Sequence, residues 1–285
     1  MLLGSEIITS PQNKYVSLAR GLANKKNREK ERKFRFDGVK LMCEAIKKGV
    51  RLSFVLAHEN EWSSVVEKAE KLYGIKESDI DCPVIFVEGT LFERLSEEMA
   101  PEGVICVAEY MSERHSILSQ GADNFSDKNE NILILESVRD PQNVGAIVRV
   151  AAAFGVDRIL MSSDCADVYN SKTIRASMGT VFGARIDKVA DMPYTVRKIR
   201  ESGRRVFAAA LKRDSARLGQ LEINRGDCVI IGNEGHGLSD EVIDACDGTV
   251  FIPMAEDVES LNAATAAAVL VWEFFGPALS GGATR

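Results

Sequence analysis

The stretch from residue 228 to residue 275 constrains the fold more than any other part of the chain. It begins with the apolar run Cys228–Ile231, which is typical of a buried strand. That strand prediction ends at residues 232–237, where three glycines favour a sharp turn and a close approach of the backbone to a ligand. A second short strand is predicted at 250–252, and an alanine-rich helix is predicted from 260 to 275.

Polar side chains follow both of these predicted strands. Glu234 lies in the glycine-rich loop, and Ser260 and Asn262 lie at the start of the last helix. In open α/β sheets, ligands bind beyond the carboxyl ends of the strands, so we expect the two loops to form one site. A purely structural interpretation stays open for these residues, because Glu234 can cap the following helix and Ser260 or Asn262 can cap the last one.

The whole chain of 285 residues alternates predicted strands with predicted helices, which favours two α/β domains. We expect the first domain at residues 1–112, a polar linker at 113–130 and the second domain at 131–285. In the first domain, strands are predicted at 34–36, 52–57, 84–87 and 104–107, and helices at 39–46, 62–73 and 91–99. Before residue 228, the second domain has predicted strands at 132–135, 158–161 and 205–211, and predicted helices at 141–154, 170–178 and 195–201.

Several classes of protein are disfavoured by composition. No apolar run approaches the roughly 20 residues that a membrane-spanning helix needs, and the N-terminal segment turns polar too soon for a secretory signal. We therefore expect a cytoplasmic protein. Six cysteines and three histidines are scattered singly along the chain, so we expect reduced thiols in the core and no metal site.

The net charge of −6 argues by itself against a nucleic-acid partner, but the charge is unevenly distributed. Residues 14–35 contain nine basic side chains and only two acidic ones, Glu29 and Glu31. Local charge decides contact with phosphates, so this basic segment is a candidate grip on RNA. The alternative, a solvated helix face, stays open. The basic residues are Lys14, Arg20, Lys25, Lys26, Arg28, Lys30, Arg32, Lys33 and Arg35.

Short sequence motifs reduce the number of possible functions further. The glycines at 232, 235 and 237 are in the wrong order for the dinucleotide-binding fingerprint, and no phosphate-binding P-loop motif is present. Three other segments occur together in the chain. They are DPQNVGAIVRVAAAFGV at 140–156, IGNEGHGLS at 231–239, and IPM at 252–254 with SLNAATA at 260–266.

In this order the three segments resemble the signature of the SpoU (TrmH) family of RNA ribose 2′-O-methyltransferases. The resemblance covers about residues 131–275, and residues 1–112 more weakly resemble the small substrate-binding domain that precedes this catalytic domain in many members. It implies an α/β fold with a C-terminal trefoil knot, preceded by a small α/β domain similar to ribosomal protein L30e. It also implies S-adenosylmethionine as cofactor, a homodimer and an RNA substrate held in the active-site cleft.

Residue by residue, the resemblance assigns two groups of positions. Gly232, Ile252 and Leu261 match backbone contacts to S-adenosylmethionine, and Gly235 and Met254 lie in the same loops. The positions that match the family's polar active-site residues are Asn143, Arg149, Glu234, Ser260 and Asn262. The sequence departs from the pattern after Asn262, where Ala-Ala-Thr stands in place of the Val-Ser of many members.

The reaction implied is methylation of a ribose 2′-hydroxyl, and the N-terminal segment 7–13 resembles the branch that modifies ribosomal RNA, most specifically 23S rRNA. Arg149 matches the residue proposed as general base in the family. A guanidinium stays protonated in proteins, so we expect Arg149 instead to hold the target phosphate and stabilise the developing alkoxide. Two alternatives remain: a tRNA methyltransferase and a non-catalytic RNA-binding module.

Overall fold

The chain forms two compact units in the computed structural model, which describes residues 7–118, 125–233, 235–255, 257–258 and 260–276. Unit 1 consists of residues 1–111 together with 167–183, and unit 2 consists of 112–166 together with 184–285. The segment 167–183, which lies within the predicted second domain, therefore packs with the first unit. The domain boundaries at 112 and 130 stay predictions.

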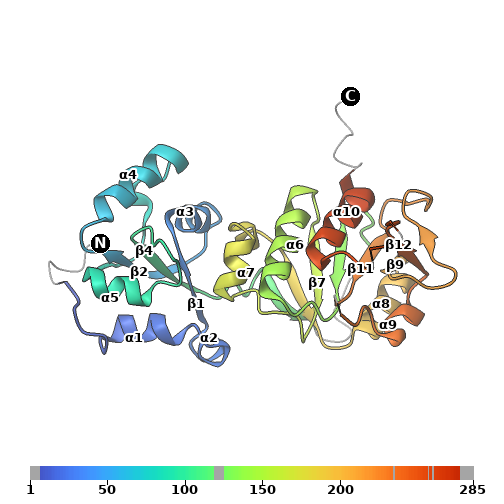
Figure 1. The fold of residues 1–285 in the computed structure, drawn as a ribbon, viewed down its shortest axis with the longest axis horizontal. Coiled ribbons are helices and arrows are strands. Elements are labelled where there is room, and N and C mark those ends of the chain that lie inside the picture. Colours follow the sequence, from blue (N-terminus) through green and yellow to red (C-terminus); the bar gives the residue numbers. More distant parts are fainter. Residues whose placement is uncertain (1–6, 119–124, 234, 256, 259, 277–285) are drawn as a thin grey trace. The chain divides into compact units, whose positions relative to one another are not determined.

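Unit 1 is a four-stranded sheet covered by helices (Figure 1). The strand order is β1-β4-β2-β3, in which β4 runs antiparallel to both its neighbours and β2 runs parallel to β3. The strands are β1 (Lys33–Asp37), β2 (Leu52–His58), β3 (Val84–Val87) and β4 (Val104–Glu109). The helices are α1 (Lys14–Gly21), α2 (Lys25–Glu31), α3 (Val39–Lys47), α4 (Trp62–Tyr73), α5 (Gly89–Leu95) and α7 (Ser171–Ala176).

Unit 2 is an eight-stranded sheet with the order β10-β12-β9-β11-β6-β7-β8-β5, in which the recorded strand pairs are all parallel. The strands are β5 (His115–Leu118), β6 (Ile132–Leu135), β7 (Arg158–Ser162), β8 (Ile186–Val189), β9 (Val206–Ala209), β10 (Ala216–Arg217), β11 (Cys228–Ile231) and β12 (Gly248–Phe251). The helices are α6 (Pro141–Ala153), α8 (Met192–Glu201), α9 (Asp240–Ala245) and α10 (Ala263–Phe275).

Helices cover both faces of this second sheet, as expected for parallel strands whose residues are buried on both sides. Ile134 of β6 belongs to a buried cluster with Val196 of α8 and Val242 of α9 on one face. On the other face, Phe207 of β9 meets Phe274 of α10 with ring centroids 6.0 Å apart, and α10 packs against α6 (Figure 1). From β6 the chain continues towards one edge of the sheet, and from the neighbouring β11 it continues towards the other edge. Open α/β sheets bind ligands at such a reversal of strand order, outside the carboxyl ends of the strands.

The predicted fold class is confirmed: an α/β protein with a parallel sheet, preceded by a small α/β unit. The trefoil knot and the likeness to ribosomal protein L30e stay predictions, because strand order and register do not record how the chain is threaded. Within the predicted linker, residues 115–118 form β5 and pair with β8. The sequence of residues 115–118 shows no strand periodicity, but pairing with β8 provides hydrogen-bond partners for their backbone N–H and C=O groups.

Candidate active site

Helices α6 and α10 of unit 2 begin close to each other, where Asn262 is hydrogen-bonded to Asn143. Asp140 caps α6 by accepting a 2.8 Å hydrogen bond from the backbone N–H of Gln142, and Pro141 suits the first turn. Asn262 caps α10 by accepting bonds from the N–H groups of Ala264 at 2.9 Å and Thr265 at 3.3 Å.

The same Asn262 side chain also reaches the start of α6. Its Nδ2 donates a 2.9 Å bond to Oδ1 of the buried Asn143. The structure therefore brings together two of the predicted polar residues, from segments far apart in the sequence. The capping interpretation of Asn262 is confirmed, and its amide nitrogen is engaged in the site at the same time.

The glycine-rich loop after β11 folds back on itself. Asn233 and Gly237 exchange backbone hydrogen bonds of 3.1 and 2.9 Å. A Cβ at Gly232 would lie 2.5 Å from the backbone carbon of Gly237, so no other residue fits there. Gly237 has φ +68°, in the left-handed region that favours glycine. The loop shape thus depends on both glycines, and the predicted residue Glu234 lies outside the described residues.

Two side chains that the sequence did not single out hold this loop. Asn233 donates from Nδ2 to the backbone oxygen of Ser137 at 3.0 Å, and its Oδ1 accepts from the N–H groups of Gly235 at 2.9 Å and His236 at 3.2 Å. The buried carboxylate of Glu136 accepts from both the N–H and the hydroxyl of Ser239, at 3.0 and 2.8 Å. Glu136 directly follows the apolar run of β6, and this signal could have identified it.

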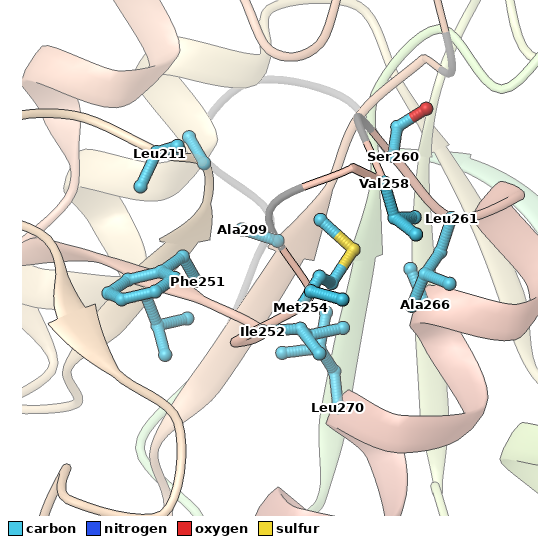
Figure 2. A pocket seen from close by; sticks show the side chains of 13 residues that line it. Ala209, Leu211, Phe251, Ile252, Met254, Val258, Ser260, Leu261, Ala266 and Leu270 are labelled. Atoms are coloured by element: carbon cyan, nitrogen blue, oxygen red, sulfur yellow. The ribbon is translucent and has the colours of Figure 1, made fainter.

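A largely apolar cavity of about 420 Å³ lies where β9 and β12 end and α10 begins (Figure 2). Four predicted residues line it: Ile252, Met254, Ser260 and Leu261. The Ser260 hydroxyl points away from the Ile252 end of the cavity (Figure 2). The lining also includes Ala209, Ala210 and Leu211 from the end of β9. These three residues were not predicted as part of the site, because the strand was predicted to continue to residue 211, whereas β9 ends at Ala209.

The other predicted residues that the structure describes do not line the cavity. Arg149 is an exposed residue of α6, about 1.7 turns after Asn143. It forms no ion pair or hydrogen bond within the described part of the chain. Gly232 and Gly235 belong to the neighbouring loop. The structure thus places an apolar cavity, a paired Asn143–Asn262 and an available guanidinium in the same unit.

Burial and hydrogen bonds shift the pKa values of two titratable groups of unit 2, Asp164 and Cys246. Burial disfavours the charged form of Asp164, but hydrogen bonds from Ser162, Ser137 and Arg139 outweigh this effect and lower its pKa to about 2. These bonds fix the turn between β6 and α6. Burial raises the pKa of the Cys246 thiol to about 12, which disfavours its thiolate form. All six cysteines are free and buried, which confirms the predicted core thiols.

The predicted basic segment in unit 1 contains both buried and exposed side chains. Arg28 is buried and forms a 2.7 Å ion pair with Asp167, and Arg35 is buried beside Asp37 at 3.3 Å. These two arginines are structural and unavailable to RNA. The exposed basic side chains of the segment are Lys14, Arg20, Lys25, Lys26, Lys30 and Arg32.

In the described part of the chain, no group of three or more His, Cys, Asp or Glu side chains could hold a metal ion. Among the same residues, no helix has the length and apolar character needed to cross a bilayer. A parallel sheet with a largely apolar cavity at its carboxyl edge is typical of α/β proteins that bind a small molecule there.

Comparison with known proteins identifies the family. The model of the SpoU rRNA methylase family matches residues 130–272, and the model of the MRM3-like substrate binding domain matches residues 13–106. The chain belongs to the SpoU rRNA methylase family, which confirms the resemblance predicted from the three motifs. It is therefore an RNA ribose 2′-O-methyltransferase of a family that depends on S-adenosylmethionine.

Individual relatives extend over almost the whole chain. The 23S rRNA (guanosine(2553)-2′-O)-methyltransferase RlmP of Bacillus subtilis is 26% identical over 270 residues, which cover 94% of this chain and 99% of the relative. The crystal structure of an rRNA methyltransferase from Sinorhizobium meliloti has a TM-score of 0.76 and 27% identity, covering 94% of this chain and 96% of the other. An AdoMet-bound structure of an rRNA methyltransferase from Sinorhizobium meliloti has a TM-score of 0.76, 26% identity and the same coverage.

Proposed function

We propose that this protein transfers a methyl group from S-adenosylmethionine to a ribose 2′-hydroxyl in 23S rRNA, in the cytoplasm. The observation that carries the proposal is the convergence of Ile252, Met254 and Leu261 on one apolar cavity in a chain of this family. The 23S substrate is supported by the name of the Bacillus subtilis relative, which this chain matches over nearly its full length.

The cavity suits the cofactor in size and chemistry. Its volume of about 420 Å³ falls in the range of small-molecule sites, and its apolar walls fit a planar heterocycle. Ile252, Met254 and Leu261 would hold the cofactor, and Gly232 would let the adjacent backbone approach it. When bound, the cofactor supplies an electrophilic methyl carbon on a sulfonium sulfur.

The residues of this chain would then bind and orient the ribose. Asn143 and Asn262 form a hydrogen-bonded polar pair, Asn262 directly follows the cavity residue Leu261, and Ser260 adds a hydroxyl at the cavity lining. The attacking 2′-oxygen would pass its proton to solvent water as it takes up the methyl group, so a nearby positive charge would stabilise the developing alkoxide. Arg149 would supply that charge and contact the adjacent phosphate through its planar fork of donors. Glu234 would orient Arg149 or the substrate.

RNA would be held through the six exposed basic residues of the segment 14–35, since Arg28 and Arg35 are used internally. This contact is electrostatic and is expected to weaken steeply with salt. The match of residues 13–106 to a substrate-binding domain supports the assignment.

A homodimer is also proposed, with α10 in the interface. Trp272 and Val269 on this helix are 47% and 38% exposed, and Trp272 meets Phe154 of α6 edge to face at 5.3 Å. An exposed apolar patch of this kind is typical of an interaction surface. Replacing Trp272 by glutamate is expected to shift the mass measured by sedimentation equilibrium from dimer to monomer. A monomeric wild-type protein would exclude the dimer.

Transfer of labelled methyl groups tests the main proposal. The protein is incubated with radiolabelled S-adenosylmethionine and with unmodified 23S rRNA, 16S rRNA or tRNA in separate reactions. We expect label in 23S rRNA, recovered after digestion as a 2′-O-methyl nucleotide. Label in tRNA alone would replace the proposed substrate, and a protein that binds RNA but neither the cofactor nor label would be a non-catalytic RNA-binding module.

The wall of the cavity formed by Leu211 provides a second test. This side chain is 75% exposed, so its truncation should leave the fold intact while removing an apolar surface for the cofactor. Leu211→Ala is expected to weaken cofactor binding about tenfold in titration calorimetry. Leu72→Ala is the matched control, because Leu72 is 59% exposed on α4 in the other unit. Equal affinities for both variants would show that Leu211 does not contact the cofactor.

A further inference from the structure

Arg32, which ends helix α2, adopts a backbone conformation that suits glycine better than arginine. Its φ and ψ are 53° and 37°, in the left-handed region. Only three non-glycine residues in the described part of the chain have a positive φ. A side chain with a Cβ costs free energy in this region, and helices commonly place glycine at this position. A non-glycine residue in this conformation is a candidate for a functional role of its side chain.

The Arg32 side chain lies at the outer end of a stack of planar groups. Its guanidinium carbon is 4.7 Å from the centroid of the Tyr110 ring. Tyr110 in turn stacks on Tyr169, with centroids 3.9 Å apart and planes 12° from parallel. Tyr169 is buried, and its hydroxyl accepts a 2.8 Å bond from the backbone N–H of Met111. The inner end of the stack is therefore fixed, while Arg32 is exposed.

The surroundings of this stack are positively charged. Helix α2 carries Lys25, Lys26 and Lys30, all exposed, within the two turns that precede Arg32. Their partners are weak: Lys30 lies 3.6 Å from Glu31, and Lys25 lies 3.9 Å from Glu29. Exposed ion pairs of this kind exchange readily with solvent and other anions. The helix thus offers several cations beside one preformed planar surface.

We propose that the Arg32–Tyr110–Tyr169 stack is a platform on which an unpaired base of the substrate RNA stacks, while the α2 lysines contact the neighbouring phosphates. Arginine planes and aromatic rings bind unstacked bases in this way. The proposal rests on the proposed function, because it takes RNA as the substrate. It adds that unit 1 recognises a single-stranded nucleotide in addition to the backbone charge.

The test separates base stacking from phosphate contact. Binding is measured for a short single-stranded oligoadenylate and for an abasic ribose-phosphate oligomer of the same length. Wild-type protein is expected to prefer the oligoadenylate. Arg32→Lys keeps the charge but loses the planar face, and it should reduce the preference about fivefold or more. Arg20→Ala, an exposed cation on α1, should weaken both oligomers equally and leave the preference unchanged.

Arg32→Gly tests whether a lost preference for the oligoadenylate results only from a change in the fold. Glycine relieves the backbone conformation, so this variant should fold with a thermal midpoint close to that of wild type and still lose the preference. It should also raise KM for rRNA while leaving kcat at saturating rRNA unchanged. An unchanged preference in Arg32→Lys and Arg32→Gly, or equal binding of both oligomers by wild type, would overturn the platform.

Failure of the platform can be distinguished from failure of the proposed function. Wild-type protein that methylates 23S rRNA but binds both oligomers equally lacks only the platform. Wild-type protein that methylates no RNA overturns the proposed function and with it the platform.

Discussion

Replacing Arg149 by alanine is expected to reduce methyl transfer about 100- to 1,000-fold, while cofactor binding stays within about twofold of wild type. The physical reason is that Arg149 is exposed on α6 and does not line the apolar cavity, so the substitution leaves the cavity intact. What it removes is a positive charge available to the ribose oxygen and its phosphate in the transition state. Single-turnover rates with saturating rRNA measure the chemical step directly.

Two further variants give this experiment its controls. Arg149→Lys keeps the charge and loses the bidentate fork, so it should fall between alanine and wild type. Near-normal turnover by Arg149→Lys would show that the fork is unnecessary. Arg197→Ala removes an exposed arginine of α8, away from the three motifs, and should retain full activity. A comparable loss in Arg197→Ala would mean that general RNA binding, and not the reaction, was affected.

The second large effect is expected from the buried ion pair between Arg28 and Asp167. Their side chains are 4% and 9% exposed, and Asp167 Oδ2 accepts from Arg28 Nε and Nη2 at 3.1 and 2.7 Å. Asp167→Asn leaves a buried guanidinium without a countercharge, which is expected to cost about 3–5 kcal/mol of unfolding free energy. Because Asp167 begins the segment 167–183, the loss should fall on unit 1.

The two tryptophans allow the units to be followed separately. Trp62 lies on α4 in unit 1 and Trp272 on α10 in unit 2, so a Trp272→Phe background leaves only Trp62 as a fluorescent reporter. Urea unfolding in this background measures the stability of unit 1. Glu29→Gln, which removes an exposed pair with Lys25, should change it by less than about 0.5 kcal/mol.

Replacing Arg28 and Asp167 together tests the ion pair as a unit. Substituting Arg28 by methionine and Asp167 by leucine removes both charges together, and should recover most of the lost stability. If Asp167→Asn alone is no more destabilising than Glu29→Gln, the segment 167–183 does not anchor on unit 1 through this pair.

Local sequence signals predicted the elements well where pattern and capping agree. The helix predicted after Asp140 is α6, because an acceptor side chain, a proline and a periodic apolar stripe all favour it. The strand predicted at Cys228–Ile231 is β11 with the same bounds. By contrast, β5 and β8 were missed, because polar residues break the apolar run in each and both depend on pairing with neighbouring strands.

The sequence predicted which residues belong to the candidate site, but not how their side chains contact one another. The motifs selected Asn143 and Asn262, yet only the folded chain shows that the two amides bond to each other across 119 positions of sequence. Asn233 and Glu136 were not selected, because their role is to hold a loop, and a loop's internal hydrogen bonds leave little trace in sequence spacing.

By itself, the sequence determined the α/β class, the central stretch at 228–275 and the family, because these follow from local periodicity and from short motifs. Tertiary structure alone decided which charges are available. Arg28 and Arg35 belong to the same basic segment as Lys26 and Arg32, but the first two are buried against carboxylates and the others face solvent. Only long-range packing decides whether a charge is neutralised inside the protein or exposed to a partner. The same packing assigns residues 167–183 to unit 1, although they lie within the segment that matches the methylase family.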